Sequence, residues 1–235
     1  MWTLLCGVLA TPVAQLAQAA TAAAPAAASA AAPDGATTQP APGRSLFEQL
    51  LDTEDGHPTV PFPFPVLLQR LRAQFEPTQP MGGLAVVLIP LGRSLQRHAA
   101  GDVDAFRYPR VVAAATGEPP ADAPPGHPYL KDRLYVAYHE KAESLEVISY
   151  NEDAGRFEFQ LVLDYRAGAR PRVLPANRSL CLACHQNAAP IFSRPSWDET
   201  SASPPIAARL AATGRDFYGL PWRHGVDVPD AIDAA

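Results

Sequence analysis

The sequence predicts an α+β fold in which short helices accompany an antiparallel β-meander. The main observation is a period-two pattern between residues 133 and 165, where apolar side chains alternate with others. Asn151 to Gly155 interrupts the pattern with turn-forming residues, as is typical of a hairpin. We expect three strands with one face on the core. Their apolar positions are Leu134, Val136, Tyr138, Leu145, Val147, Phe157, Phe159, Leu161, Leu163 and Tyr165.

Short helices are expected before and after these strands. Ser45, followed three positions later by Glu48, is the pattern of a capping box and predicts a helix over residues 45–52. Pro65 suits a first helical turn and predicts a second helix over residues 65–75. The remaining expected elements are a strand over residues 84–91, a surface loop over residues 116–128 and a helix over residues 206–212.

The N-terminal part of the chain differs in composition from the rest. Residues 1–19 contain a short apolar run and end in Ala17-Gln18-Ala19, so we expect an export signal. Residues 20–43 are mostly alanine, proline and threonine and are expected to form a disordered linker. Residues 44–235 would then be the α+β domain, with the candidate functional segment at about residues 175–225.

Charge and hydropathy restrict the possible partners. The net charge is −5 and no basic stripe is present, which argues against nucleic-acid binding. Because a membrane-spanning helix needs roughly 20 apolar residues, no transmembrane segment is expected beyond the signal. Cys6 is a poor candidate for a lipid anchor, since Leu5 is an unfavourable residue before a lipidated cysteine.

Residues 181–185, Cys-Leu-Ala-Cys-His, form the most informative motif of the chain. On one turn of helix, Cys181 and Cys184 lie close enough to bond to the vinyl groups of one porphyrin. His185 can then present an imidazole nitrogen to the iron as proximal ligand. The motif therefore predicts covalent haem c bound through Cys181, Cys184 and His185.

Other interpretations of the cysteine pair stay open. A thioredoxin-like dithiol would need the motif at a helix start in a βαβ setting, whereas this motif follows antiparallel strands. A zinc site of cysteines alone would need a second pair, and the only other cysteine is Cys6. A disulfide between Cys181 and Cys184 would close a very small loop and add little stability.

Residues 181–185 resemble the haem-attachment site of c-type cytochromes, and the following residues up to 200 look like those of exported bacterial proteins with a single such motif. The resemblance implies haem c, an exported or periplasmic location and a redox partner protein of unknown identity. It does not extend to the fold, because small cytochromes c carry the motif near the start of a helical domain and a methionine ligand downstream.

No methionine follows the motif in this chain, so the sixth iron ligand is undecided. His224 and Met81 are the main candidates, because His224 is the one histidine downstream and Met81 lies beside two glycines. The others considered are His57, His98, His127 and His139. Residues expected to line the pocket or bind the propionates are Arg178, Arg194, Trp197, Pro190, Ile191 and Phe192.

The possible functions differ in whether a protein side chain is the sixth ligand of the iron. Two protein ligands on the iron favour one-electron transfer, which is the function we expect. A vacant position instead favours a five-coordinate haem that acts as a peroxidase or binds a gas. A third possibility is an exported interaction module without haem, in which the two cysteines form a disulfide.

Overall fold

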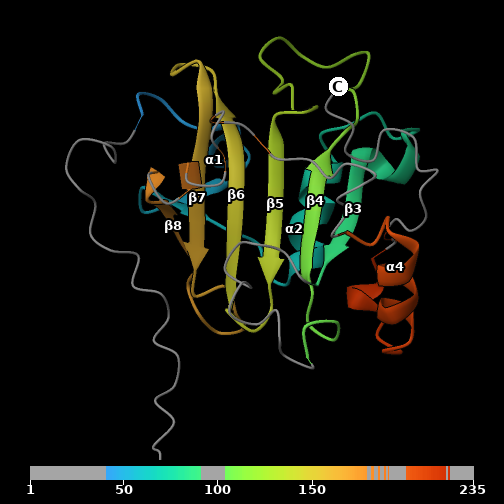
Figure 1. Ribbon diagram of the computed structural model, residues 1–235. Helices are drawn as coiled ribbons and strands as arrows, with labels where there is room; N and C mark the ends of the chain where they lie inside the picture. Colours follow the sequence, from blue (N-terminus) through green and yellow to red (C-terminus); the bar gives the residue numbers. More distant parts are fainter. Residues whose placement is uncertain are drawn as a thin grey trace, which may run out of the picture.

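The computed structural model describes residues 41–90, 104–178, 181, 182, 185, 188, 190, 200–220 and 222. Within these residues, six strands form one antiparallel sheet in which every strand pairs with its neighbour in sequence (Figure 1). The architecture is therefore mixed α and β but mostly β, as expected. The strands are β3 (Leu84–Ile89), β4 (Arg110–Ala115), β5 (Leu134–His139), β6 (Ser144–Asn151), β7 (Arg156–Leu163) and β8 (Arg172–Pro175).

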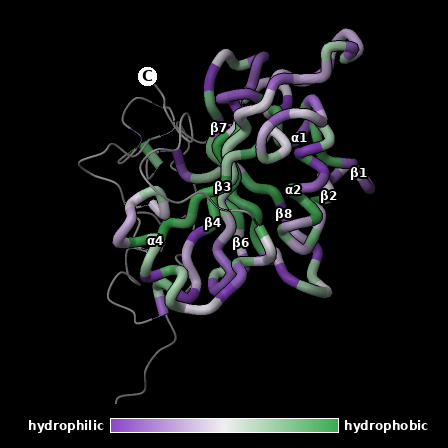
Figure 2. The backbone as a smooth tube through the Cα atoms, turned by 90° about the vertical axis from the view of Figure 1, so that its right-hand side faces the viewer, coloured by the Kyte–Doolittle hydropathy of each residue, from purple (hydrophilic) through white to green (hydrophobic). Residues whose placement is uncertain are grey.

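Smaller elements surround this sheet. A short hairpin contains β1 (Asp52–Glu54) and β2 (His57–Thr59), and the helices are α1 (Leu46–Gln49), α2 (Phe64–Arg72) and α4 (Pro204–Ala211). Single 3-10 turns occupy Pro80–Gly83 and Phe217–Gly219. Helices α1 and α2 lie together on one side of the sheet, and α4 lies beyond its β3 edge (Figures 1 and 2). Among the described residues, no helix has the length and apolar character required to cross a bilayer.

The three strands expected between residues 133 and 165 are confirmed as β5, β6 and β7, and the expected strand near residue 84 is confirmed as β3. The capping box is present, because the Ser45 hydroxyl accepts from the Glu48 N–H while the Glu48 carboxylate accepts from the Ser45 N–H. This helix ends at Gln49, earlier than expected, since β1 begins at Asp52. The expected signal, and the expected linker as far as residue 40, lie outside the described residues.

The two faces of the sheet follow from its register. The core face packs against α1 and α2, and its side chains lie in the main hydrophobic cluster. On β3 to β7 these residues are Leu84, Val86, Leu88, Val111, Ala113, Ala115, Leu134, Val136, Tyr138, Leu145, Val147 and Val162. We call the opposite side the outer face.

The expectation for β7 was wrong about which side chains meet the core. Val162 pairs with Leu145 on the core face, so Phe157, Phe159, Leu161 and Leu163 point to the outer face. Tyr165 is in the core because Asp164 has a φ of 58°, which ends the strand alternation. Apolar residues occupy the outer positions of β7, and alternation alone cannot tell which of two sheet faces is covered by helices.

Polar side chains on the core face anchor α1. The Ser45 hydroxyl donates to Gln160 Oε1 at 3.0 Å, and the Phe47 N–H donates to the Ser149 hydroxyl at 2.8 Å. Buried polar groups on β6 and β7 are thus hydrogen-bonded by the first helix, which removes the cost of burying them unpaired. Phe47 itself is completely buried.

Gly83 is required where the chain enters β3. Its φ is +73°, and an added Cβ would lie 2.4 Å from Cγ of the buried Phe75. Gly155 in the β6–β7 hairpin has a similar φ of +61° but no atom within 4 Å of the same position.

We expect Gly83→Ala to lower the free energy of unfolding by about 1–3 kcal/mol more than Gly155→Ala does, because only Gly83→Ala adds a steric clash. Urea unfolding of both variants measures this difference, and equal losses would contradict the clash.

Candidate functional site

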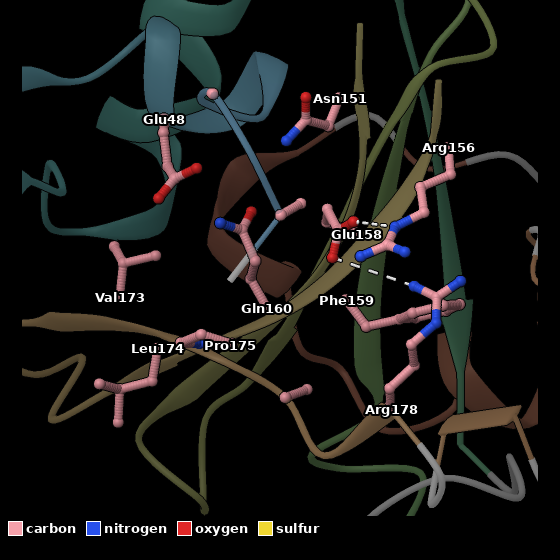
Figure 3. A pocket seen from close by; sticks show the side chains of 13 residues that line it. Glu48, Asn151, Arg156, Glu158, Phe159, Gln160, Val173, Leu174, Pro175 and Arg178 are labelled. Carbon is pink, nitrogen blue, oxygen red and sulfur yellow. Dashed lines mark hydrogen bonds and ion pairs between the residues drawn. The ribbon is translucent and has the colours of Figure 1, made fainter. Parts of the chain in front are cut away.

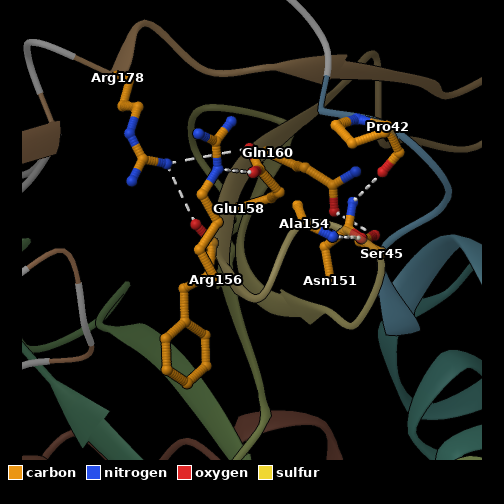
Figure 4. A network of polar contacts seen from close by, with 9 residues as sticks. Pro42, Ser45, Asn151, Ala154, Arg156, Glu158, Gln160 and Arg178 are labelled. Carbon is orange, nitrogen blue, oxygen red and sulfur yellow. Dashed lines mark hydrogen bonds and ion pairs between the residues drawn. The ribbon is translucent and has the colours of Figure 1, made fainter.

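The segment that leads to the cysteine motif follows the edge of β7. Strand β8 pairs only with Gln160 to Leu163, so no described strand lies beside the first half of β7 on that edge. Just after β8, the Ala176 N–H donates to the Phe159 carbonyl at 2.8 Å. The Arg178 guanidinium then donates to the Phe157 carbonyl at 3.1 Å. An arginine side chain thus continues the hydrogen bonding of the edge after the strand ends (Figure 4).

The motif begins directly after this edge contact. Arg178, Cys181 and Leu182 have helical backbone, and the Cys181 N–H donates to the Asn177 carbonyl at 3.2 Å. The His185 N–H donates to the Cys181 carbonyl at 2.8 Å. These bonds connect residues four positions apart, as in an α-helix, and place Cys181 and His185 one turn apart. Cys184 lies outside the described residues, so the helix over the whole motif stays a prediction.

His185 lies against the sheet through an aromatic contact. Its ring centroid is 5.2 Å from that of Phe159, with an interplanar angle of 54°. The Arg178 guanidinium lies 5.7 Å from the centroid of the same phenyl ring. Phe159 is 6% exposed, whereas Cys181 and His185 are half-buried. An imidazole therefore lies against an apolar ring of the sheet, one helical turn from a half-buried thiol.

More aromatic rings adjoin Phe159 on the outer face. The Phe157 ring is 5.4 Å from the Tyr150 ring and 6.5 Å from the Tyr135 ring, measured between centroids. We call Tyr135, Tyr150, Phe157 and Phe159 the outer aromatic patch. The sequence pattern identifies these residues as apolar strand positions but assigns those of β7 to the core, so it does not predict their place beside the motif.

Two of the proposed sixth ligands, Met81 and His139, lie away from Phe159. Met81 is in the turn before β3, at the opposite edge of the sheet from β8, so about four strand spacings or 19 Å separate β3 from β7. His139 lies about 13 Å further along the strands than Tyr135, which is in register with Phe159 through Ile148. His139 is also buried and bound to Glu146.

The other histidine candidates divide between described and undescribed residues. His57 is an exposed residue of β2. His127 contacts the Gln74 carbonyl at 2.9 Å through Nε2. His98 and His224 lie outside the described residues, as do the expected pocket residues Arg194, Trp197, Ile191 and Phe192. Among the described residues, no group of three or more histidine, cysteine or acidic side chains is arranged to hold a metal ion.

A small cavity of about 90 Å³ lies next to Arg178, at the ends of β7 and β8 (Figure 3). Several of its polar side chains already have hydrogen-bond or ion-pair partners. Glu158 accepts from Arg156 Nε at 2.6 Å and lies 3.9 Å from Arg178 Nη1. Asn151 donates to the Pro42 carbonyl and accepts from the Ala154 N–H (Figure 4). These contacts connect the ends of β6, β7 and β8 with the segment before α1.

The comparisons with known proteins give no further identification. No family model matches the chain, and neither the curated proteins nor the solved structures include a significant match.

A charged cluster that the sequence analysis does not predict lies elsewhere on the outer face. Glu146 Oε2 is 3.1 Å from His139 Nε2 and 3.0 Å from Arg110 Nη1. Burial alone would raise the pKa of Glu146, but the contacts with His139 and Arg110 outweigh burial and hold its pKa well below the usual value. The feature of the sequence that could have indicated this cluster is Glu146, an acidic residue among the apolar positions of β6.

Glu146 gives the protein a specific sensitivity to acid. Because its pKa is lowered in the folded state, its contribution is complete above the unfolded pKa of about 4.3 and is lost as the pH falls further toward the folded pKa. We expect Glu146→Gln to lower the free energy of unfolding by about 2 kcal/mol at neutral pH, and by progressively less below about pH 4. Urea titrations across this pH range measure how the stabilities of the variant and the unchanged chain approach each other. Glu118→Gln, at an exposed ion pair with Lys131, is the matched control and should change stability little. A loss in Glu146→Gln that is independent of pH would contradict this account.

Proposed function

We propose that this chain binds haem c covalently through Cys181 and Cys184, with His185 as proximal iron ligand, and transfers single electrons in the periplasm or another exported location. The motif carries the proposal, and the described part of its geometry supports it. Cys181 and His185 lie one helical turn apart, and the His185 ring adjoins the apolar ring of Phe159.

The residues of the chain have separate roles in this proposal. Haem iron supplies one-electron chemistry when bound, and the protein supplies ligands, orientation and exclusion of water. Phe159 restricts the orientation of the His185 ring through their contact. Arg178 brings a positive charge next to the motif, where a guanidinium can pair with a propionate. The half-buried surroundings of His185 favour a partly dry site.

One observation favours a second function, a five-coordinate haem that binds peroxide or a gas. Among the described residues, Met81 and His139 are placed away from the contact between His185 and Phe159. A vacant sixth position would leave the iron open to exogenous ligands. Absorption spectra with and without cyanide or carbon monoxide separate the two functions. Spectra unchanged by both ligands support electron transfer, and a shift with either supports the second function.

Expression of the whole chain together with a haem-maturation system tests covalent attachment. We expect a c-type pyridine haemochrome band and a mass increase of about 616 Da on the peptide that contains residues 181–185. Cys181→Ser with Cys184→Ser should abolish both signals, whereas Cys6→Ser, the matched control, should keep them. A disulfide between Cys181 and Cys184, or two thiols without the added mass, would contradict the proposal and favour an interaction module without haem.

A further inference from the structure

The sheet has apolar side chains on both faces, which is unusual for an antiparallel sheet whose described helices α1 and α2 pack on one face. On β7, the outer positions are Phe157, Phe159, Leu161 and Leu163. Phe159 is buried, and the other three are half-buried. These side chains are already partly covered, so the outer face of β7 is packed against other groups and is not a plain solvent-facing surface.

Three of the four rings of the outer aromatic patch are in contact, and Phe159 lies two positions from Phe157 on the same face of β7. Phe157 contacts Tyr150 and Tyr135, and burial raises the pKa of the Tyr135 phenol, as expected for a ring in apolar surroundings. Flat aromatic faces interact well with other extended π-systems. The patch is therefore suited to a planar, largely apolar ring system.

Two arginines border the patch on different sides. Arg178 lies over Phe159, on the side of the motif. Arg133 lies 5.1 Å from the Tyr150 ring centroid and pairs with Glu152 at 2.8 Å. Guanidinium groups beside an apolar surface suit a ligand that carries carboxylates at its rim.

The position of His185 indicates which class of ligand would contact this surface. The His185 ring contacts Phe159, a member of the patch, and Cys181 lies one helical turn from His185. A group attached at the cysteines and held by this imidazole is thereby brought next to the patch. An anionic tetrapyrrole fits both the attachment chemistry and the rings that adjoin it.

We propose that the outer aromatic patch is the surface on which the tetrapyrrole attached at residues 181–185 rests, with Phe157 as a contact residue and Phe159 as the positioning residue for His185. The inference rests on the proposed function. It adds the side of the sheet that receives the ring system and residues that the motif does not contain.

Phe157→Thr is the main test, because it removes a ring from the patch and keeps a residue that favours strands. We expect covalent attachment, read as the added mass, to persist in this variant. The midpoint potential should fall, because water has better access to the iron and stabilises its more highly charged state. In a chain that also carries Cys181→Ser and Cys184→Ser, haemin binding measured by absorbance titration should weaken roughly tenfold.

Leu163→Thr is the matched control. Leu163 is on the same strand and the same outer face as Phe157, and it is also half-buried. It lies about 20 Å from Phe157 and about 13 Å from Phe159 along β7, on the side away from the rest of the outer aromatic patch. We expect this variant to keep the midpoint potential and haemin affinity of the unchanged chain. Phe157→Leu should also keep them, because it restores an apolar side chain.

The outcomes separate this inference from the proposed function. Covalent haem with equal potentials and haemin affinities in Phe157→Thr and Leu163→Thr would overturn the inference alone, and would indicate that other parts of the chain cover the patch. Absence of the added mass on the unchanged chain would overturn both. Circular dichroism melting checks that each variant folds, and Tyr150→Ser replaces Phe157→Thr if that variant does not.

Discussion

The alternation of side chains along an unbroken antiparallel ladder is the constraint on which the rest of this structure depends. Six strands pair in sequence order, so the face assigned to one residue fixes the face of every residue in register with it. Gln160 points toward α1 and its neighbour Phe159 points toward His185. A slip of one residue in β7 would exchange these two side chains, so the same register that docks the first helix also provides the surface for the motif.

Much of the strand content could be predicted because it depends on local patterns. The strands β5, β6 and β7 show clear alternation, and the Ser45–Glu48 capping box is a short-range signal. The sequence does not predict β4, since it ends in three alanines, which favour strands weakly. It does not predict β8, which is short and ends in proline. Both strands form because neighbouring strands supply their hydrogen bonds, which is a tertiary effect.

For the candidate site too, local sequence patterns predict some features and not others. The cysteine and histidine residues can be identified from five consecutive positions, because the chemistry requires that spacing. The contact between His185 and Phe159 joins residues far apart in the chain, and no sequence pattern near either residue predicts it. The charged cluster of Arg110, His139 and Glu146 likewise brings together three strands. Patterns within one segment identify reactive side chains, whereas their surroundings depend on strand pairing.

Arg178 has a further consequence for the behaviour of the protein in concentrated solution. Strand edges with free carbonyl and N–H groups can pair with the edges of other molecules and so begin aggregation. The guanidinium of Arg178 donates a hydrogen bond to the Phe157 carbonyl, in the part of β7 that does not pair with β8. A charged side chain at this position disfavours the approach of a second sheet, so we expect the residue that leads into the motif to reduce self-association as well.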